Sequence, residues 1–171
     1  MSLILEDGTG VLGANTYVTL DEYRAYHIGV SGDATHGDSS KITGAAITAT
    51  MSLGGKRWKG APANGRSQPL AWPRRDVVDA NGLDVSSTEI PQEVKLAQMA
   101  TMYAIIADGH SPFGVSDPAT TLKSFKVDII TEVYAIPDDP AKNTQSLPHV
   151  DQIISGLVLS ASGLFMPIVS E

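Results

Sequence analysis

The order of apolar and polar residues predicts a mainly helical chain whose first part holds two helices. Thr19 and Glu22 have the spacing of a capping box, in which each side chain accepts a hydrogen bond from the other residue's backbone amide. Apolar residues follow at helical spacing, so we expect a short helix that ends near Ile28. A second helix is predicted from residue 39 or 40 to the glycine pair at 54–55.

Two further helices are predicted after a proline each. Pro91 suits the first turn of a helix, where no partner is needed for the missing N–H, and Glu93 lies near the positive end of the helix dipole. The apolar spacing behind them continues to Gly109. A last helix is predicted to begin near Pro148 and to run through Leu157.

Two segments have a β pattern instead. Residues 77–85 place β-branched residues on both sides of Asn81-Gly82, a dipeptide that favours a tight turn, which predicts a small hairpin. Residues 121–136 alternate apolar and polar side chains. An unbroken strand there would be about 45 Å long at ~3.3 Å per residue, so the segment either turns near Asp128 or projects as an arm.

These elements together predict the α+β class, mainly α: a compact bundle of about four helices with a small hairpin and a longer β element or arm near residues 121–136. A chain of 171 residues is long enough for one hydrophobic core. We expect a single domain over residues 1–158, with the β element inserted in it, and a C-terminal docking tail over residues 159–171.

The chain is acidic, but its charge is unevenly distributed. Its net charge is −7, and residues 56–75 carry six basic residues and no acidic one. Residues 1–55 carry six acidic and two basic residues, and residues 76–171 carry thirteen and four. A protein that grips DNA over its whole surface needs excess positive charge, because phosphate neutralisation supplies most of its affinity. Any contact with nucleic acid must therefore be local.

Cysteine is absent from the sequence, which excludes disulfides, a thiolate nucleophile and thiolate-ligated metal. This fits a reducing cytoplasm or an assembly built in one. The first residues lack the basic and apolar regions of a signal peptide, so secretion is not expected.

Three patterns that carry chemistry in other proteins lack their context here. Residues 8–13 match G-x-G-x-x-G, but a dinucleotide site needs a helix that starts within the glycines, and the predicted helix starts only after Thr19. Residues 33–38 offer two carboxylates and an imidazole, too few ligands for a hard cation. The sequence holds neither H-E-x-x-H nor G-x-S-x-G. We therefore predict no enzyme activity, no metal and no cofactor.

The segment of residues 56–75 allows three interpretations. It carries both tryptophans among its basic residues: Lys56, Arg57, Trp58, Lys59, Arg66, Trp72, Arg74 and Arg75. The rings could pack on the helices while the arginines pair with carboxylates. The same residue types could form a protein interface, where Trp and Arg supply much of the contact energy. They could also bind single-stranded DNA, where cations follow the phosphates and rings stack on bases.

Five blocks, in order along nearly the whole chain, resemble a tailed-phage family found among virion structural genes. They are Glu6-Asp7-Gly8-Thr9-Gly10, Ala14-Asn15-Thr16-Tyr17-Val18, Leu70-Ala71-Trp72-Pro73-Arg74, Ile90-Pro91-x-x-Val94-Lys95-x-Ala97-Gln98 and Val150-Asp151-x-Ile153-Ile154. Members of that family are often labelled DnaT-like single-stranded-DNA-binding proteins, and they are similar to head-tail adaptor (head-completion, connector) proteins.

The resemblance implies a structural virion protein that is assembled in the bacterial cytoplasm and located at the head-tail junction. Its implied partners are further copies of itself in a ring, commonly of twelve, the portal protein, the next neck or tail protein and the packaged double-stranded DNA that passes through the lumen. No membrane is implied. The alternative is a single-stranded-DNA-binding replication protein.

The two functions predict different roles for overlapping residues. For the adaptor we expect subunit or portal contacts from the basic segment and the tail, at Arg57, Trp58, Trp72, Arg74, Arg75, Leu164, Phe165, Met166 and Ile168. For the alternative we expect DNA contacts at Lys56, Arg57, Lys59 and Arg66.

Overall fold

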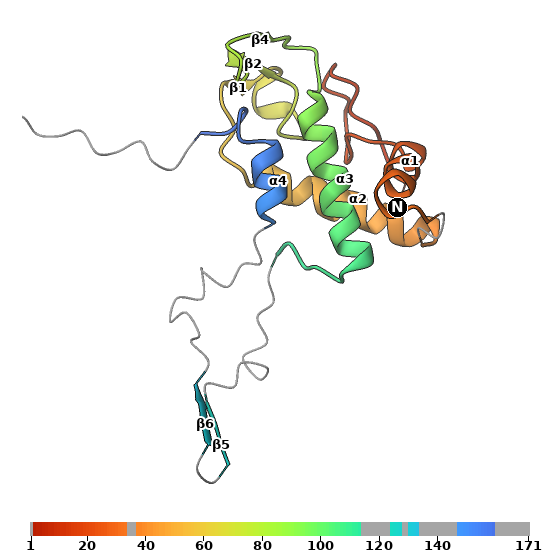
Figure 1. The fold of residues 1–171 in the computed structure, drawn as a ribbon. Helices are drawn as coiled ribbons and strands as arrows, with labels where there is room; N and C mark the ends of the chain where they lie inside the picture. Colours follow the sequence, from red (N-terminus) through yellow and green to blue (C-terminus); the bar gives the residue numbers. More distant parts are fainter. Residues whose placement is uncertain (1, 34–36, 114–123, 128–129, 134–146, 160–171) are drawn as a thin grey trace, which may run out of the picture.

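A computed structural model describes residues 2–33, 37–113, 124–127, 130–133 and 147–159 (Figure 1). In this part of the chain the helices are α1 (Leu20–Ser31), α2 (Ser39–Gly54), the short 3₁₀ helix η1 (Gly65–Ser67), α3 (Gln92–Ala107) and α4 (Pro148–Ile153). The strands are β1 (Ala61–Pro62), β2 (Arg74–Arg75), β3 (Val77–Val78), β4 (Asp84–Val85), β5 (Ser124–Val127) and β6 (Ile130–Val133). The predicted α+β class with four α-helices is confirmed.

Local capping explains where the first two helices begin and end. The Thr19 side chain accepts from the amide of Glu22, whose carboxylate accepts from the amide of Thr19, so the predicted capping box is confirmed. α1 continues three residues past the predicted end at Ile28, because Gly32 adopts a left-handed conformation (φ 69°) and its N–H closes the last turn. α2 begins where predicted, and Asp38 caps it by accepting from the amide of Lys41.

The last helix is shorter than the sequence pattern predicted. α4 ends at Ile153, and residues 154–157 form tight turns instead of continuing to Leu157. Gly156 lies in these turns and packs closely on the β3–β4 hairpin, where an added Cβ would be 2.9 Å from the Cβ of Ala80.

All paired strands in the described residues form two-stranded antiparallel sheets. The hairpin predicted around Asn81-Gly82 is confirmed, with Val77 paired to Val85. Residues 121–136 do not form one unbroken strand, because in their described part β5 pairs antiparallel with β6 from Ser124–Val133 to Val127–Ile130. Figure 1 draws the β5–β6 pair away from the helices.

Helices α2 and α3 pack against each other, α4 packs on α3, and α1 contacts both α2 and α3 (Figure 1). Alanines on the facing surfaces, Ala46 of α2 and Ala97 of α3 among them, are fully buried and allow close packing. One cluster of core residues fills the space between α1, α2 and α3. A second cluster, which includes both tryptophans, lies between α3, α4 and the segment that follows α2.

A buried glutamine ties the N-terminal segment to both central helices. Gln98 of α3 is fully buried. Its Oε1 accepts from the backbone N–H of Tyr17 at 2.9 Å, and its Nε2 donates to Thr16 Oγ1 at 2.8 Å and to the carbonyl of Ala46 at 3.3 Å. Because its polar atoms have partners, the side chain can lie in the core at little cost.

Candidate interaction surface

The basic segment of residues 56–75 is folded and lies between the end of α2 and the residues that follow α4. It leaves the end of α2, and its two ends approach each other where Ala61 pairs with Arg75 and Pro62 with Arg74. Its first residues also pair with the end of the described chain, because Lys59 N–H donates to the carbonyl of Leu157 at 2.9 Å. The segment therefore connects the end of α2 with the residues that follow α4, and its own β1–β2 pair closes it.

Both tryptophans lie inside this structure. Trp72 is fully buried, and Trp58 keeps only 6% of its surface exposed. Their rings meet edge to face, with centroids 5.7 Å apart and planes at 84°, a favoured geometry for aromatic pairs. The indole N–H of Trp58 donates to the carbonyl of Leu53 at 3.0 Å. Neither ring can therefore stack on a base or contact a partner in this conformation.

Arg74 holds the basic segment closed. Its guanidinium donates to three backbone carbonyls, those of Lys59 (2.7 Å), Gly60 (2.7 Å) and Ala71 (3.1 Å). Partial burial lowers the pKa of Arg74 from its usual value, but an arginine remains charged at neutral pH. One interpretation of the sequence was that the arginines of this segment pair with carboxylates. The partners of Arg74 are backbone carbonyls instead. Arg74 is thus a structural cross-link within the chain.

Two lysines of the segment attach it to the C-terminal helix. Lys56 Nζ forms an ion pair with Asp151 of α4 at 2.6 Å. Lys59 Nζ donates to the carbonyl of Gly156 at 2.6 Å and to that of Val78 at 3.3 Å. Carbonyls behind the end of a helix have no partner in the helix itself, and a lysine supplies the donor there.

Three guanidinium groups of the segment remain at the surface. Arg57 and Arg66 are exposed, and among the described residues no side-chain hydrogen bond or ion pair is found for either. Arg75 is 61% exposed, and its Nε is 4.0 Å from a carboxylate oxygen of Asp76, which is a weak contact. These three residues, Arg57, Arg66 and Arg75, are called the exposed arginines below.

The glycine-rich residues near the N-terminus form a turn around a carboxylate from the chain itself. Glu6 is buried, and its two oxygens accept from the amides of Gly8 (3.0 Å), Gly10 (2.8 Å) and Val11 (3.0 Å). The helix begins later, at Leu20, as predicted. The amides that would face a phosphate in a dinucleotide site are therefore occupied by Glu6. This role of Glu6 was not predicted, although an acid just before closely spaced glycines is a signal for it in the sequence.

The predicted tail contacts cannot be compared with the structure. Leu164, Phe165, Met166 and Ile168 lie outside the described residues. Of residues 33–38, positions 34–36 also lie outside them, and the described part of the chain contains no group of three potential metal ligands.

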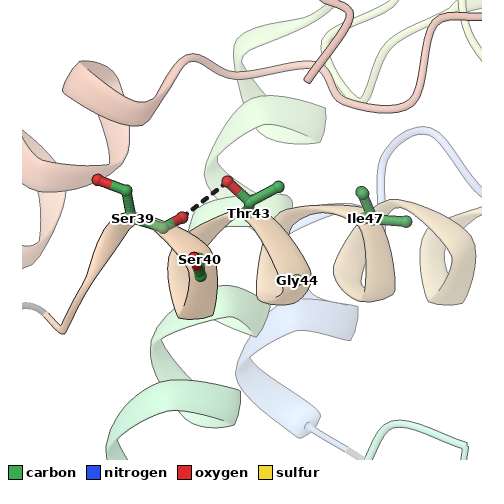
Figure 2. A pocket seen from close by; sticks show the side chains of 5 residues that line it. All are labelled: Ser39, Ser40, Thr43, Gly44 and Ile47. Atoms are coloured by element: carbon green, nitrogen blue, oxygen red, sulfur yellow. Dashed lines mark hydrogen bonds between the residues drawn. The ribbon is translucent and has the colours of Figure 1, made fainter. Parts of the chain in front are cut away.

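One shallow pocket lies on the outer surface of α2, as Figure 2 shows. The described residues that line it are Ser39, Ser40, Thr43, Gly44 and Ile47. The Thr43 hydroxyl donates to the carbonyl of Ser39 at 2.7 Å, so it is already satisfied within the helix. None of these side chains is an acid, a base or a cation, and the pocket offers no chemistry beyond weak packing.

None of the helices in the described ranges is both long and apolar enough to cross a membrane.

The comparisons with known proteins give one match. Residues 1–170 match the family described as "Putative DnaT-like ssDNA binding protein". Neither the curated proteins nor the solved structures gave a match to this chain.

Proposed function

The chain belongs to this DnaT-like family, and we propose that it functions as a head-tail adaptor, a structural protein that forms a ring between the portal and the next neck protein of a tailed phage. The proposal starts from the ordered sequence blocks that resemble virion structural genes. The structural observation that carries it is the use of the basic segment inside the fold, which favours an assembly role over a role in gripping single-stranded DNA.

A groove for single-stranded DNA combines cations along the backbone with aromatic faces on which bases stack. In the basic segment both rings are buried, and Lys56, Lys59 and Arg74 bind acceptors of the same chain. Only the exposed arginines remain, in a chain of net charge −7. Exposed arginines without accessible aromatic faces are better suited to docking against an acidic protein, because complementary charge directs and registers association.

An acidic ring also suits a channel through which DNA passes. The sequences on both sides of the basic segment have net charges of −4 and −9. Acidic walls repel phosphates and so do not hold the DNA, while the same acidic groups can meet the exposed arginines of a neighbouring copy.

Purified phage particles provide the test of this function. Quantitative mass spectrometry or a reconstruction of the neck should find this chain in several copies at the head-tail junction, twelve if the ring has the common stoichiometry of the resembled proteins. Complete absence of the chain from mature particles would refute the proposal.

Single-stranded DNA binding is the second candidate function, because the description of the family names it. Fluorescence anisotropy with a labelled oligonucleotide distinguishes the two functions. For an adaptor we expect no sub-micromolar affinity at physiological salt. Tight binding that weakens steeply with salt, and that is lost when the exposed arginines are changed to glutamate, would favour the second candidate.

The charge reversal must omit Arg74. Changing that residue opens the segment, so a loss of binding or assembly would not report on a surface contact. Arg57→Glu, Arg66→Glu and Arg75→Glu alter exposed groups and should leave the circular dichroism spectrum unchanged.

A further inference from the structure

The chain contains the tripeptide Ala-Asn-Gly twice, at residues 63–65 and 80–82. An asparagine followed by glycine can lose its side-chain amide without an enzyme, because glycine has no side chain that would shield its backbone nitrogen or restrict its rotation. Since the two tripeptides are identical, a clear difference in their reactivity would come mainly from the fold. The surroundings of Asn64 and Asn81 therefore decide which of the two reacts.

Asn64 is held by the N-terminal turn. Its Nδ2 donates to the carbonyl of Thr9 at 3.2 Å, and a Cβ added at Gly10 would be only 2.0 Å from that nitrogen. Glu6 fixes the turn in turn, because its carboxylate accepts from three backbone amides there. The side-chain carbonyl carbon of Asn64 therefore cannot rotate toward the backbone nitrogen of Gly65 unless the hydrogen bond to Thr9 breaks.

Asn81 lies on the open turn of the β3–β4 hairpin. Asn81 and Gly82 are both exposed, and no atom lies within 4 Å of a Cβ added at Gly82. The N–H of Asn81 donates to the carboxylate of Asp79 at 2.8 Å, and that of Gly82 donates to the carbonyl of Asp79 at 3.3 Å. Hydrogen bonds from the amide of Leu83 and then from Asn81, its side chain included, hold the pKa of Asp79 below its usual value. These bonds all lie within residues 79–83, so the reaction at Asn81 breaks none of the described hydrogen bonds to another element.

We propose that Asn81 is a site of spontaneous deamidation in the folded protein, whereas Asn64 is protected. The backbone nitrogen of Gly82 attacks Cγ of Asn81, so that an N–Cγ bond forms and the Cγ–Nδ2 bond breaks. Nδ2 leaves as ammonia with the proton that the nitrogen of Gly82 gives up, and a succinimide ring remains. Water, the only co-reactant, then opens the ring at either carbonyl and gives aspartate or isoaspartate, and no group is oxidised or reduced. This chemistry does not depend on the proposed function.

The reaction changes a turn that packs on the rest of the fold. Both products add a negative charge between Asp79 and Asp84, and isoaspartate also adds a methylene to the backbone. Ala80, the residue before Asn81, lies so close to Gly156 that a Cβ added at Gly156 would be 2.9 Å from the Cβ of Ala80. The lengthened backbone therefore alters the contact between the hairpin and the residues that follow α4.

Peptide mapping by mass spectrometry, after incubation of the native protein at mildly alkaline pH, measures both sites in one sample. We expect Asn81 to react about 2- to 10-fold faster than Asn64, which is the rate equivalent of the one net hydrogen bond, to Thr9, that Asn64 has to break. The chain denatured in guanidinium chloride is the control. The contacts of Asn64 are lost there, so the two sites should react at nearly equal rates.

Equal rates at the two sites of the native protein, or faster reaction at Asn64, would overturn the proposal. So would an unchanged Asn81 under conditions in which the denatured chain reacts. A pair of variants gives a second measurement, because anion exchange separates the more acidic deamidated form from the original protein. Asn81→Ser keeps a residue that suits turns but removes the amide, and it should abolish most of the acidic form, whereas Asn64→Ser should leave its rate of appearance nearly unchanged. An acidic form that appears equally fast in Asn81→Ser would also contradict the proposal.

Discussion

Replacement of Gln98 by leucine should destabilise the fold strongly, although the new side chain is apolar and of similar size. Gln98 supplies the acceptor found for the backbone N–H of Tyr17. Only 1% of the surface of Tyr17 is exposed. A buried donor without a partner costs about 1–3 kcal/mol. The two groups that accept from Gln98 Nε2 would keep other hydrogen bonds. Thr16 Oγ1 also bonds the backbone of Val18, and the carbonyl of Ala46 also accepts from Thr50.

The expected total follows from these terms. The unpaired amide of Tyr17 and the lost hydrogen bonds from Nε2 lower the free energy of unfolding. The greater apolarity of leucine raises it. We expect a net loss of about 2–3 kcal/mol in the free energy of unfolding. At a urea dependence of about 1–3 kcal/mol per molar, the unfolding midpoint should fall by roughly 0.7–3 M.

Equilibrium unfolding in urea measures this effect through circular dichroism and through the fluorescence of the buried tryptophans. Gln92→Leu is the matched control, because Gln92 begins the same helix and is exposed. The control should remain within about 0.5 kcal/mol of wild type. Equal midpoints for Gln98→Leu and Gln92→Leu would refute the view that Gln98 is a polar cross-link of the core.

Three further predictions concern stability. Arg74→Lys should cost about 1–3 kcal/mol in urea unfolding, because lysine cannot reproduce the three-carbonyl fork, while Arg75→Lys at the exposed neighbouring position should be neutral. Tyr23→Phe should leave the melting temperature unchanged or raise it, because the buried Tyr23 hydroxyl has no hydrogen-bond partner among the described residues; a clear decrease would reveal one. Burial raises the pKa of Tyr17 to about 12, so the unfolded chain loses this proton first, at about pH 10. The contribution of Tyr17 to stability should therefore be constant below about pH 10 and fall between pH 10 and 12, in the same direction as that of Tyr23, whose pKa burial also raises to about 12; alkaline urea titrations would detect this fall.

The features that could be predicted from the sequence are those decided by neighbouring residues. The capping box at Thr19, the proline start of α3 and the Asn81-Gly82 hairpin each depend on contacts within a few residues. The prediction for the end of α4 was wrong, and the turns that follow this helix pack near Ala80, a residue remote in sequence that local patterns do not bring into view.

The candidate surface was less predictable for the same reason. Arg57 and Arg74 are equivalent in a count of charges, yet one is exposed and the other bonds carbonyls up to fifteen residues away. The sequence did suggest that the tryptophans could pack on the helices, as one of three interpretations. It could not select that interpretation, because the partner ring of Trp58 is fourteen residues further on, at Trp72.

The concentration of positive charge in an acidic chain therefore has a largely structural cause. The segment after α2 reverses direction repeatedly between short strands, and such turns leave carbonyl groups without strand or helix partners. Lysine and arginine are pure donors on long side chains, so Lys59 and Arg74 can reach several of those carbonyls at once. Carboxylates in the same positions could accept only from N–H groups and would leave the carbonyls unpaired. Among the basic residues of this segment, only the exposed arginines have no structural role in the fold, so under the proposed function they are the side chains that an acidic partner would contact.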